Sequence, residues 1–432
     1  MSPANSRQPG ARTVSLTTLF MLAVIIALGV FLRAQAFLGT DVVEPLQGDA
    51  AEAYELAQVL DRQGAIQVLS GPFDSSSSAE LGEVYSSLGY PLFLSLFVGE
   101  REAASSLSGA VITQIVLGAL AILLVFMLAT RLLDPYWGLT VALLTAISPY
   151  LVNISLYLVG STLLMVALLF YLLTTAKISD RGALLRSFFA AALLGVVAWV
   201  DATYQFLILP WVILLFFSSK GASRFLVPVA AVLGFALVFG PLIAMNQTAI
   251  DTAVPTSSMA ASIQEGMRPA AETAAQAPTK VSLIGALGQL GGGLIDDPRG
   301  FLSWYFVEKP QVLWSLGGPP EIEQTFVYAV SQTPYADNPG FLAGEEFMQL
   351  LHGPVVLLGL LGLILVWLPF AGRRLSSAQL IGLRTLSMVV VYATLAHLFG
   401  VAAPQHATPL MPLVFMMALT PLYLITLPRP QQ

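Results

Sequence analysis

Long apolar runs divide the chain into segments that fit the length of a membrane-spanning helix. A hydrocarbon core takes about 20 apolar residues per helix, whereas a membrane β-barrel would show alternating segments of about ten residues. The pattern therefore predicts an all-α polytopic membrane protein. We expect about ten spans, at residues 15–38, 107–131, 136–152, 156–176, 185–201, 203–219, 223–246, 351–371, 379–401 and 406–427.

Two long loops interrupt the short turns between these spans. Most connections in helix bundles are short, and long loops on a rigid scaffold often carry function. We therefore expect five parts. They are the N-terminus with the first span (1–38), a first outer loop (39–106), six spans (107–246), a second outer loop (247–350), and the last three spans with the C-terminus (351–432).

The first loop opens with an amphipathic helix, expected from about Ala50 to Arg62. Its apolar residues recur at helical spacing and are predicted to hold the helix on the membrane surface, while its acids face water. The short segment Leu88–Gly99 is expected to re-enter the membrane or lie on its surface. The apolar positions are Tyr54, Leu56, Ala57 and Leu60, and the acids predicted to face water are Glu52 and Glu55.

The second loop begins with an Ala/Thr/Pro-rich stretch, about Thr252 to Lys280, that is expected to be flexible because it has little to bury. The chain becomes apolar again from Val281. Aromatic residues follow that suit the headgroup layer. A second interfacial helix is therefore expected around Trp304 to Trp314.

Composition and charge agree with a membrane protein. The chain is 56% hydrophobic and 10% charged, carries a net charge of −6, and has no cysteine, which excludes disulfides, thiolate metal sites and cysteine nucleophiles. Most lysines and arginines fall in one set of loops, so we expect both termini in the cytoplasm of a plasma (inner) membrane protein and the long loops outside. The outer face is acidic, which argues against nucleic acid as a partner.

Asp49, at the start of the first loop helix, is the leading site candidate. It fits a first-turn acid favoured by the helix dipole, and it also fits a general base at the membrane surface. Asp201, between two spans, fits either a turn acid or a substrate contact. The three histidines, His352, His397 and His406, lack metal-ligand spacing. No metal site is predicted, and dependence on a divalent metal stays open.

The order of motifs resembles the GT-C glycosyltransferases, closest to the group that includes protein O-mannosyltransferases and lipid A aminoarabinose transferases. The resemblance covers most of the chain. It rests on Arg33 ending the first span, on Asp49, Tyr54 and Ala57 in the loop helix, and on five short motifs. These motifs are "GYPLFLSLF", "ISPYLVNIS", "FGPLIAMN", "DDPRGFLSWYFVEKP" and "QHATPLMPLVFMMA".

The resemblance implies a GT-C bundle that transfers a sugar from a polyprenyl-phosphate donor to an unknown protein, lipid or glycan acceptor outside, with Asp49 as catalytic base. Since the leaving phosphate needs cationic or amide donors, we expect Arg33, Lys309 and His406 to contact it. The residues expected to contact substrate are Glu52, Tyr54, Tyr90, Asp201 and Asn246.

A different class remains as the alternative: a GT-C-like scaffold without catalysis that serves as a structural or assembly subunit of a membrane complex. Met245 and His406 stand where many GT-C enzymes carry basic residues, and this motivates the alternative. A transporter is disfavoured, because it predicts inverted repeats and charged or broken helices at the bilayer midplane, and neither is found in the sequence.

Overall fold

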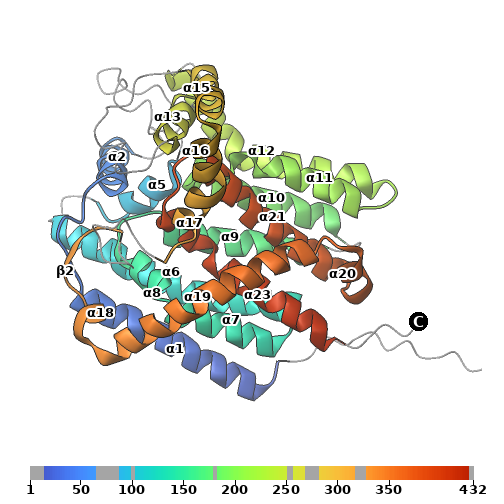
Figure 1. The fold of residues 1–432 in the computed structure, drawn as a ribbon, viewed down its shortest axis with the longest axis horizontal. Helices are drawn as coiled ribbons and strands as arrows, with labels where there is room; N and C mark the ends of the chain where they lie inside the picture. The colour runs from blue at the N-terminus through green and yellow to red at the C-terminus, as the bar shows by residue number, and fades with distance from the viewer. Residues whose placement is uncertain are drawn as a thin grey trace, which may run out of the picture.

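The computed structural model describes residues 14–64, 87–98, 103–178, 182–250, 256–267, 282–316 and 327–427, which form a helical bundle. Its long helices run in roughly the same direction, and the short helices of the two loops gather at one end (Figure 1). The long helices are α1 (Leu16–Gly39), α6 (Ala103–Leu132), α10 (Ala183–Val200), α12 (Ser223–Ile250), α19 (Pro339–Leu365), α21 (Ser377–Phe399) and α23 (Met411–Thr426), the last entered through α22 (Pro404–Ala407) and η5 (Thr408–Leu410).

Seven helices in the described ranges are long and apolar enough to cross a membrane, and they fall at seven of the predicted segments. The chain is therefore a multi-pass membrane protein. The other three predicted segments have a different form, because their helices break or end early. Segment 136–152 is a bent pair, α7 (Pro135–Ile147) and α8 (Pro149–Asn153), and segments 156–176 and 203–219 hold the shorter helices α9 (Ser161–Thr175) and η3 (Ala202–Leu207) with α11 (Ile208–Ser218).

The bend between α7 and α8 measures 62° and has a local cause. Proline has no amide hydrogen, and it disfavours helical backbone at the residue before it. Ser148, directly before Pro149, accordingly has an extended backbone with φ −61° and ψ 119°. The α7 helix therefore ends inside the bundle and leaves carbonyl oxygens without helical partners.

Arg33 of α1 donates hydrogen bonds to carbonyl oxygens on both sides of this bend. Its side chain is fully buried, and its guanidinium donates to Ala146 O at 3.5 Å and to Leu151 O at 2.9 Å, as well as to Gly29 O at 3.0 Å. A Cβ on Gly118 of α6 would lie 2.6 Å from Arg33 Nε, so only glycine leaves room there. Arg33 thus joins α1, α6, α7 and α8 at one point.

The two outer loops are joined by a short sheet that the all-α expectation missed. Strand β1 (Asp41–Val42) pairs antiparallel with β2 (Val330–Gln332), with Asp41 opposite Gln332. Ser331 Oγ donates to the Asp41 carboxylate at 2.7 Å. Runs of two and three residues carry no recognisable alternation, which explains why the sequence did not predict them.

Short helices fill the loops, partly where none was expected. The first loop holds α2 (Asp49–Gln63) and α5 (Gly89–Ser95). In the second loop, α13 (Thr256–Gly266) lies in the stretch expected to be flexible, and α19 begins at Pro339, earlier than the predicted span. The remaining short elements are η2 (Ile154–Leu156), α15 (Leu283–Asp296), α16 (Pro298–Ser303), the π-helical turn η4 (Trp304–Glu308), α17 (Lys309–Leu313), α18 (Pro334–Asp337) and α20 (Pro369–Arg374).

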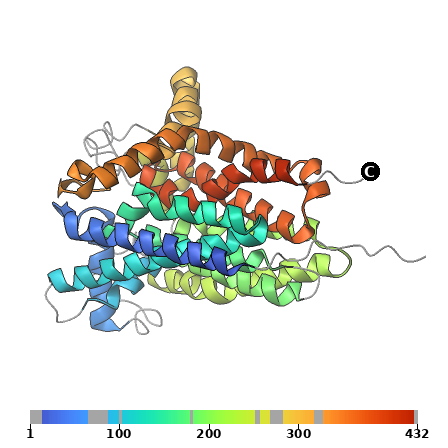
Figure 2. The same cartoon turned by 90° about the horizontal axis from the view of Figure 1, so that it is seen from below.

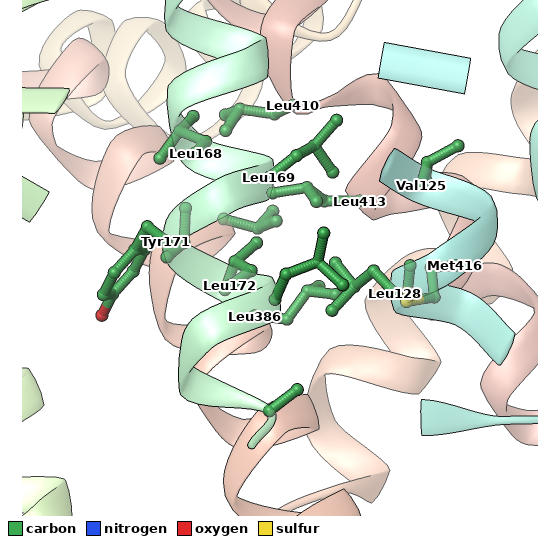
Figure 3. Close-up of a cluster of buried hydrophobic side chains, with 14 of the residues drawn as sticks. Val125, Leu128, Leu168, Leu169, Tyr171, Leu172, Leu386, Leu410, Leu413 and Met416 are labelled. Carbon is green, nitrogen blue, oxygen red and sulfur yellow. The ribbon is translucent and has the colours of Figure 1, made fainter. Parts of the chain in front are cut away.

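The centre of the core lies where α6, α9, α21 and α23 meet. Figure 3 shows leucines of α9 meeting side chains from the other three helices, among them Val125, Leu386 and Met416. The span from α22 through α23 is the most enclosed of the candidate spans, with 83% of its apolar stretch buried. A membrane helix enclosed in this way contacts protein rather than lipid, so it fixes the positions of its neighbours.

We expect Gly362→Ala to destabilise the bundle, because an added Cβ would lie 2.0 Å from Met417 O, where α19 crosses α23. Overpacking of this kind costs about 1–3 kcal/mol. The midpoint of thermal unfolding in detergent should fall. Gly344→Ala is the matched control on the same helix, because its Cβ meets open space. Equal midpoints for the two variants would contradict the close packing of α19 on α23.

Candidate functional site

Asp49, the predicted base, is the first residue of α2 and is exposed. Gly48 precedes it with a φ of +50°, a conformation that glycine adopts readily. An acid in the first turn of a helix is favoured by the helix dipole, which accounts for part of the position of Asp49. The observed helix agrees with the predicted range to within one residue at each end.

The buried face of α2 contacts protein, which corrects the expectation that it rests on the membrane surface. Leu56 and Leu60 are buried in a cluster with Leu88, Phe239 and Leu242, and Ala57 is buried in a neighbouring cluster. The spacing predicted which side is apolar, but not what covers it. Glu52 and Glu55 are exposed, as predicted. Helix α2 is therefore fixed to the bundle, and Asp49 is placed by packing.

Two residues from the second loop share the electrostatic surroundings of Asp49. Burial, and then the Asp49 carboxylate, raise the pKa of Glu265 near the end of α13. Burial and Asp49 also raise the pKa of Tyr328, whose hydroxyl lies 3.9 Å from the place a Cβ would take on Gly48. Glu265 near the end of α13 and Tyr328 before β2 thus lie within electrostatic reach of Asp49.

His406 of α22 also lies in the electrostatic field of Asp49, and in that of Asp201. Its ring stacks on that of His397 from α21, with ring centroids 4.4 Å apart and an angle of 9° between planes. Asp201 caps η3 by accepting the Thr203 amide hydrogen at 2.9 Å. Asp49, Asp201 and His406, three residues far apart in sequence, are therefore brought into one electrostatic neighbourhood.

Lys309 is buried beside this region and is held by backbone. Its Nζ donates to Leu398 O and to Gly400 O, both at 2.7 Å, and lies 4.4 Å from the centre of the Tyr305 ring. A Cβ on Gly266 would lie 2.9 Å from the same nitrogen, so the end of α13 packs on it. Burial lowers the pKa of Lys309 to about 8. These contacts fasten the second loop to the end of α21.

Among the other predicted site residues, Glu52 on α2 acts together with Asp49 on Tyr328 and helps to raise its pKa. The carbonyl contacts of Arg33 do not support the predicted phosphate contact. Tyr90 is buried and donates to Gln114 Oε1 at 2.8 Å, and the Gln114 amide donates to Ser155 O and Tyr157 O. Tyr54 is half-buried on α2. The side chain of Asn246 lies outside the described residues, so its predicted substrate contact stays a prediction.

Sequence reasoning missed Glu265 and Tyr328, which Asp49 influences, and His397, which stacks on His406. Glu265 belongs to the Ala/Thr/Pro-rich stretch, and the only signal for it was a short polar and apolar alternation in "SIQEG". His397 was considered only as a metal ligand. Among the described residues, no group of three or more His, Asp or Glu is arranged to hold a metal ion.

Comparison with known proteins identifies the fold. No protein-family model matches the chain, and no curated protein matches it in sequence. Two solved structures of the oligosaccharyltransferase of Archaeoglobus fulgidus are similar in fold: the apo form, with a TM-score of 0.51, and AglB in complex with an inhibitory peptide and a dolichol-phosphate, with a TM-score of 0.50. Both are 14% identical to this chain and cover 94% of it.

These neighbours confirm the predicted GT-C-type fold. The chain spans about half the length of the oligosaccharyltransferase chains, since the match covers 50% of each. The neighbours are oligosaccharyltransferases, whereas the sequence motifs resemble protein O-mannosyltransferases and aminoarabinose transferases. The fold is shared, while the reaction has to be argued from the residues of this chain.

We expect Lys309→Met to weaken the pH dependence of stability at alkaline pH. The folded state releases the Lys309 proton near pH 8, while the unfolded chain keeps it to about pH 10.5. The unfolded state therefore binds more protons between these values, and stability rises with pH across them. Thermal unfolding in detergent from pH 7 to pH 10.5 measures this rise.

Lys220→Met serves as the control, because Lys220 is exposed in the turn between α11 and α12. It should keep the wild-type pH profile. A Lys309→Met profile with the full wild-type rise would show that the buried ammonium does not titrate as described.

Proposed function

We propose that this protein is a membrane glycosyltransferase of the GT-C type. It transfers a sugar from a polyprenyl-phosphate donor to an acceptor on the extracytoplasmic side, with inversion and with Asp49 as general base. The observation that carries the proposal is the position of Asp49. It is an exposed carboxylate at the start of α2, beside Gly48, which the Tyr328 hydroxyl approaches, and it acts electrostatically on Glu265 of α13 and His406 of α22.

The reaction follows from what a carboxylate can do at such a position. Asp49 accepts the proton of an acceptor hydroxyl or amine while the acceptor's lone pair forms a bond to the anomeric carbon. The bond from that carbon to the phosphate oxygen breaks, and polyprenyl phosphate leaves with the electron pair. General base catalysis of this kind contributes about 10²- to 10⁴-fold to the rate.

Glu265 supports the same assignment. It is a second carboxylate in the field of Asp49, and both burial and Asp49 raise its pKa. Two neighbouring acids with different surroundings divide acid and base roles, because repulsion favours one charged and one protonated group. We assign the base to Asp49, the first residue of α2, and a hydrogen-bonding contact with substrate to Glu265.

His406 is the hydrogen-bond donor assigned to the leaving phosphate. Arg33 and Lys309 share this predicted role, but the Nη1 and Nη2 atoms of Arg33 and the Nζ of Lys309 already donate to backbone carbonyl oxygens. His406 lies within the electrostatic reach of both Asp49 and Asp201. A ring N–H there would donate a hydrogen bond to the phosphate oxygen as the glycosidic bond breaks. We also propose that the substrate is contacted by Glu52, Tyr54, Tyr90 and Asp201.

A lipid-linked donor is supported by an apolar groove next to α2. The groove has a volume of about 380 Å³ and is lined by side chains of α11 and α12. Phe239 lines it and also belongs to the cluster that buries Leu56 and Leu60 of α2. We assign the groove to part of the isoprenoid tail. The fold neighbour bound to a dolichol-phosphate makes this class of donor the first to test.

The proposed setting is the plasma (inner) membrane, with both termini in the cytoplasm. In this orientation α2, α13 and α22 face the outside, where the acceptor arrives. The first acceptor to test is a peptide, because one fold neighbour is in complex with an inhibitory peptide.

A second candidate function is favoured by one observation. Two of the cations expected to hold the phosphate instead fill structural roles at backbone carbonyls. A GT-C-like scaffold that lacks catalysis and serves as an assembly subunit would need only these structural roles. Wild-type protein that turns over no donor, and that purifies with a partner chain covering Asp49, would favour this candidate.

We expect Asp49→Asn to lower the rate of sugar transfer by about 10²- to 10⁴-fold, since an amide cannot accept the proton. Purified protein in lipid nanodiscs, a panel of polyprenyl-phosphate hexoses and a peptide acceptor form the assay, read as loss of donor and gain of glycosylated acceptor. Glu55→Gln, an exposed acid on the same helix, is the control and should keep wild-type rates. An Asp49→Asn rate equal to wild type would remove Asp49 from the mechanism.

We expect Ala236→Trp to fill the groove and to raise KM for the lipid donor with little change in kcat, because tail binding is uniform in the ground and transition states. Leu233→Trp is the control, since Leu233 is exposed on α12 but does not line the groove. Water-soluble donors with a short isoprenoid tail should show the same KM in both variants. An unchanged KM for the long-tailed donor would place the tail elsewhere.

A further inference from the structure

Helix α15 presents an apolar face that no described residue covers. Ile284 and Ile295 are 83% and 79% exposed, and Leu287 and Leu294 are also exposed. These four residues recur at helical spacing, so they lie on one side of the helix. The other side faces α13: Ala286 is fully buried, and Gln289 Oε1 accepts a hydrogen bond from Gln264 at 3.0 Å.

The exposed apolar surface continues along the chain toward the bundle. Leu302, Phe306 and Val307, on α16 and η4, are exposed, with Phe306 at 71%. The next helix, α17, packs against α21. Helix α21 is one of the candidate membrane spans, and it exposes Leu395 and Phe399 near its outer end. The segment from α15 to α17, called the arm below, therefore leads from an exposed apolar helix to a spanning helix.

The direction of α15 is unlike that of the spanning helices. Figure 1 shows α15 nearly end-on, while the spanning helices run across the view. After a 90° turn, Figure 2 shows the helix lengthwise, standing out to one side of the bundle. Its axis therefore crosses the axes of the spanning helices, and lies roughly along the plane of a membrane that those helices cross.

We propose that the arm is a membrane contact: the apolar face of α15 inserts into the outer lipid leaflet. An amphipathic helix in the plane of the interface buries its apolar face among the acyl chains and keeps its polar face toward water or protein. Ile284, Leu287, Leu294 and Ile295 form the lipid face, and the side with Ala286 and Gln289 packs on α13. Continuity with α21 favours lipid over a protein partner, because the same leaflet covers both surfaces.

Site-directed spin labelling tests this directly, because the chain has no native cysteine. Ile284→Cys and Ile295→Cys place labels on the lipid face. Asp296→Cys, exposed on another side of α15, is the matched control. Each full-length variant is reconstituted into nanodiscs of phosphatidylcholine and phosphatidylglycerol, and retention of the wild-type thermal midpoint shows that it is folded. Collision with oxygen reports lipid, and collision with a water-soluble nickel chelate reports water.

We expect the two lipid-face labels to collide severalfold more with oxygen than with the nickel chelate, and the Asp296→Cys label to show the reverse. Water-like values at all three positions would overturn the proposal. Low collision with both reagents at Ile284→Cys and Ile295→Cys would also overturn it, because a second copy or another protein would then cover the face. Donor turnover does not enter this experiment, so its result is independent of the proposed function.

Discussion

The bundle depends on buried cations that donate hydrogen bonds to backbone carbonyl oxygens. Pro149 ends α7 inside the apolar interior, where unpaired carbonyl oxygens are costly. The guanidinium of Arg33 donates to three carbonyl oxygens there and so joins α1 to both sides of the bend. Charge-assisted hydrogen bonds offset the desolvation of the cation. Removing one partner alone would leave either a buried charge or buried carbonyls.

The position of the candidate site follows from this bend through a series of contacts. The chain after α8 runs through η2, whose Ser155 carbonyl accepts from Gln114, and Gln114 in turn accepts from Tyr90. Tyr90 belongs to α5, which packs against α2. Lys309 makes the second attachment, at the end of α21, and holds the loop that carries Glu265. Asp49 therefore stands on a rigid support although it belongs to a loop.

The sequence predicted the features that depend on local pattern. Apolar runs located the spans, and helical spacing located α2 with Asp49 at its start. The contacts of Arg33 and Lys309 were not predictable, because their partners are carbonyl oxygens that become available only where a helix ends in three dimensions. The packing of α2 on protein was missed for a related reason. Periodicity shows which side of a helix is apolar but not whether lipid or protein contacts that side. Helix α13 was missed because its stability comes from tertiary packing rather than from propensity.

The π-helical turn at Trp304–Glu308 has a consequence for how the arm is used. In it the Lys309 amide hydrogen-bonds to the carbonyl of Trp304, five residues back, so the turn holds one residue more than an α-helical turn. One extra residue rotates the following side chains by about 100°. The rotation lets Phe306 point outward while Lys309, three positions later, reaches the bundle. Deleting one residue here would shift every later side chain to a wrong side, so the length of this turn is as constrained as the identity of the lysine.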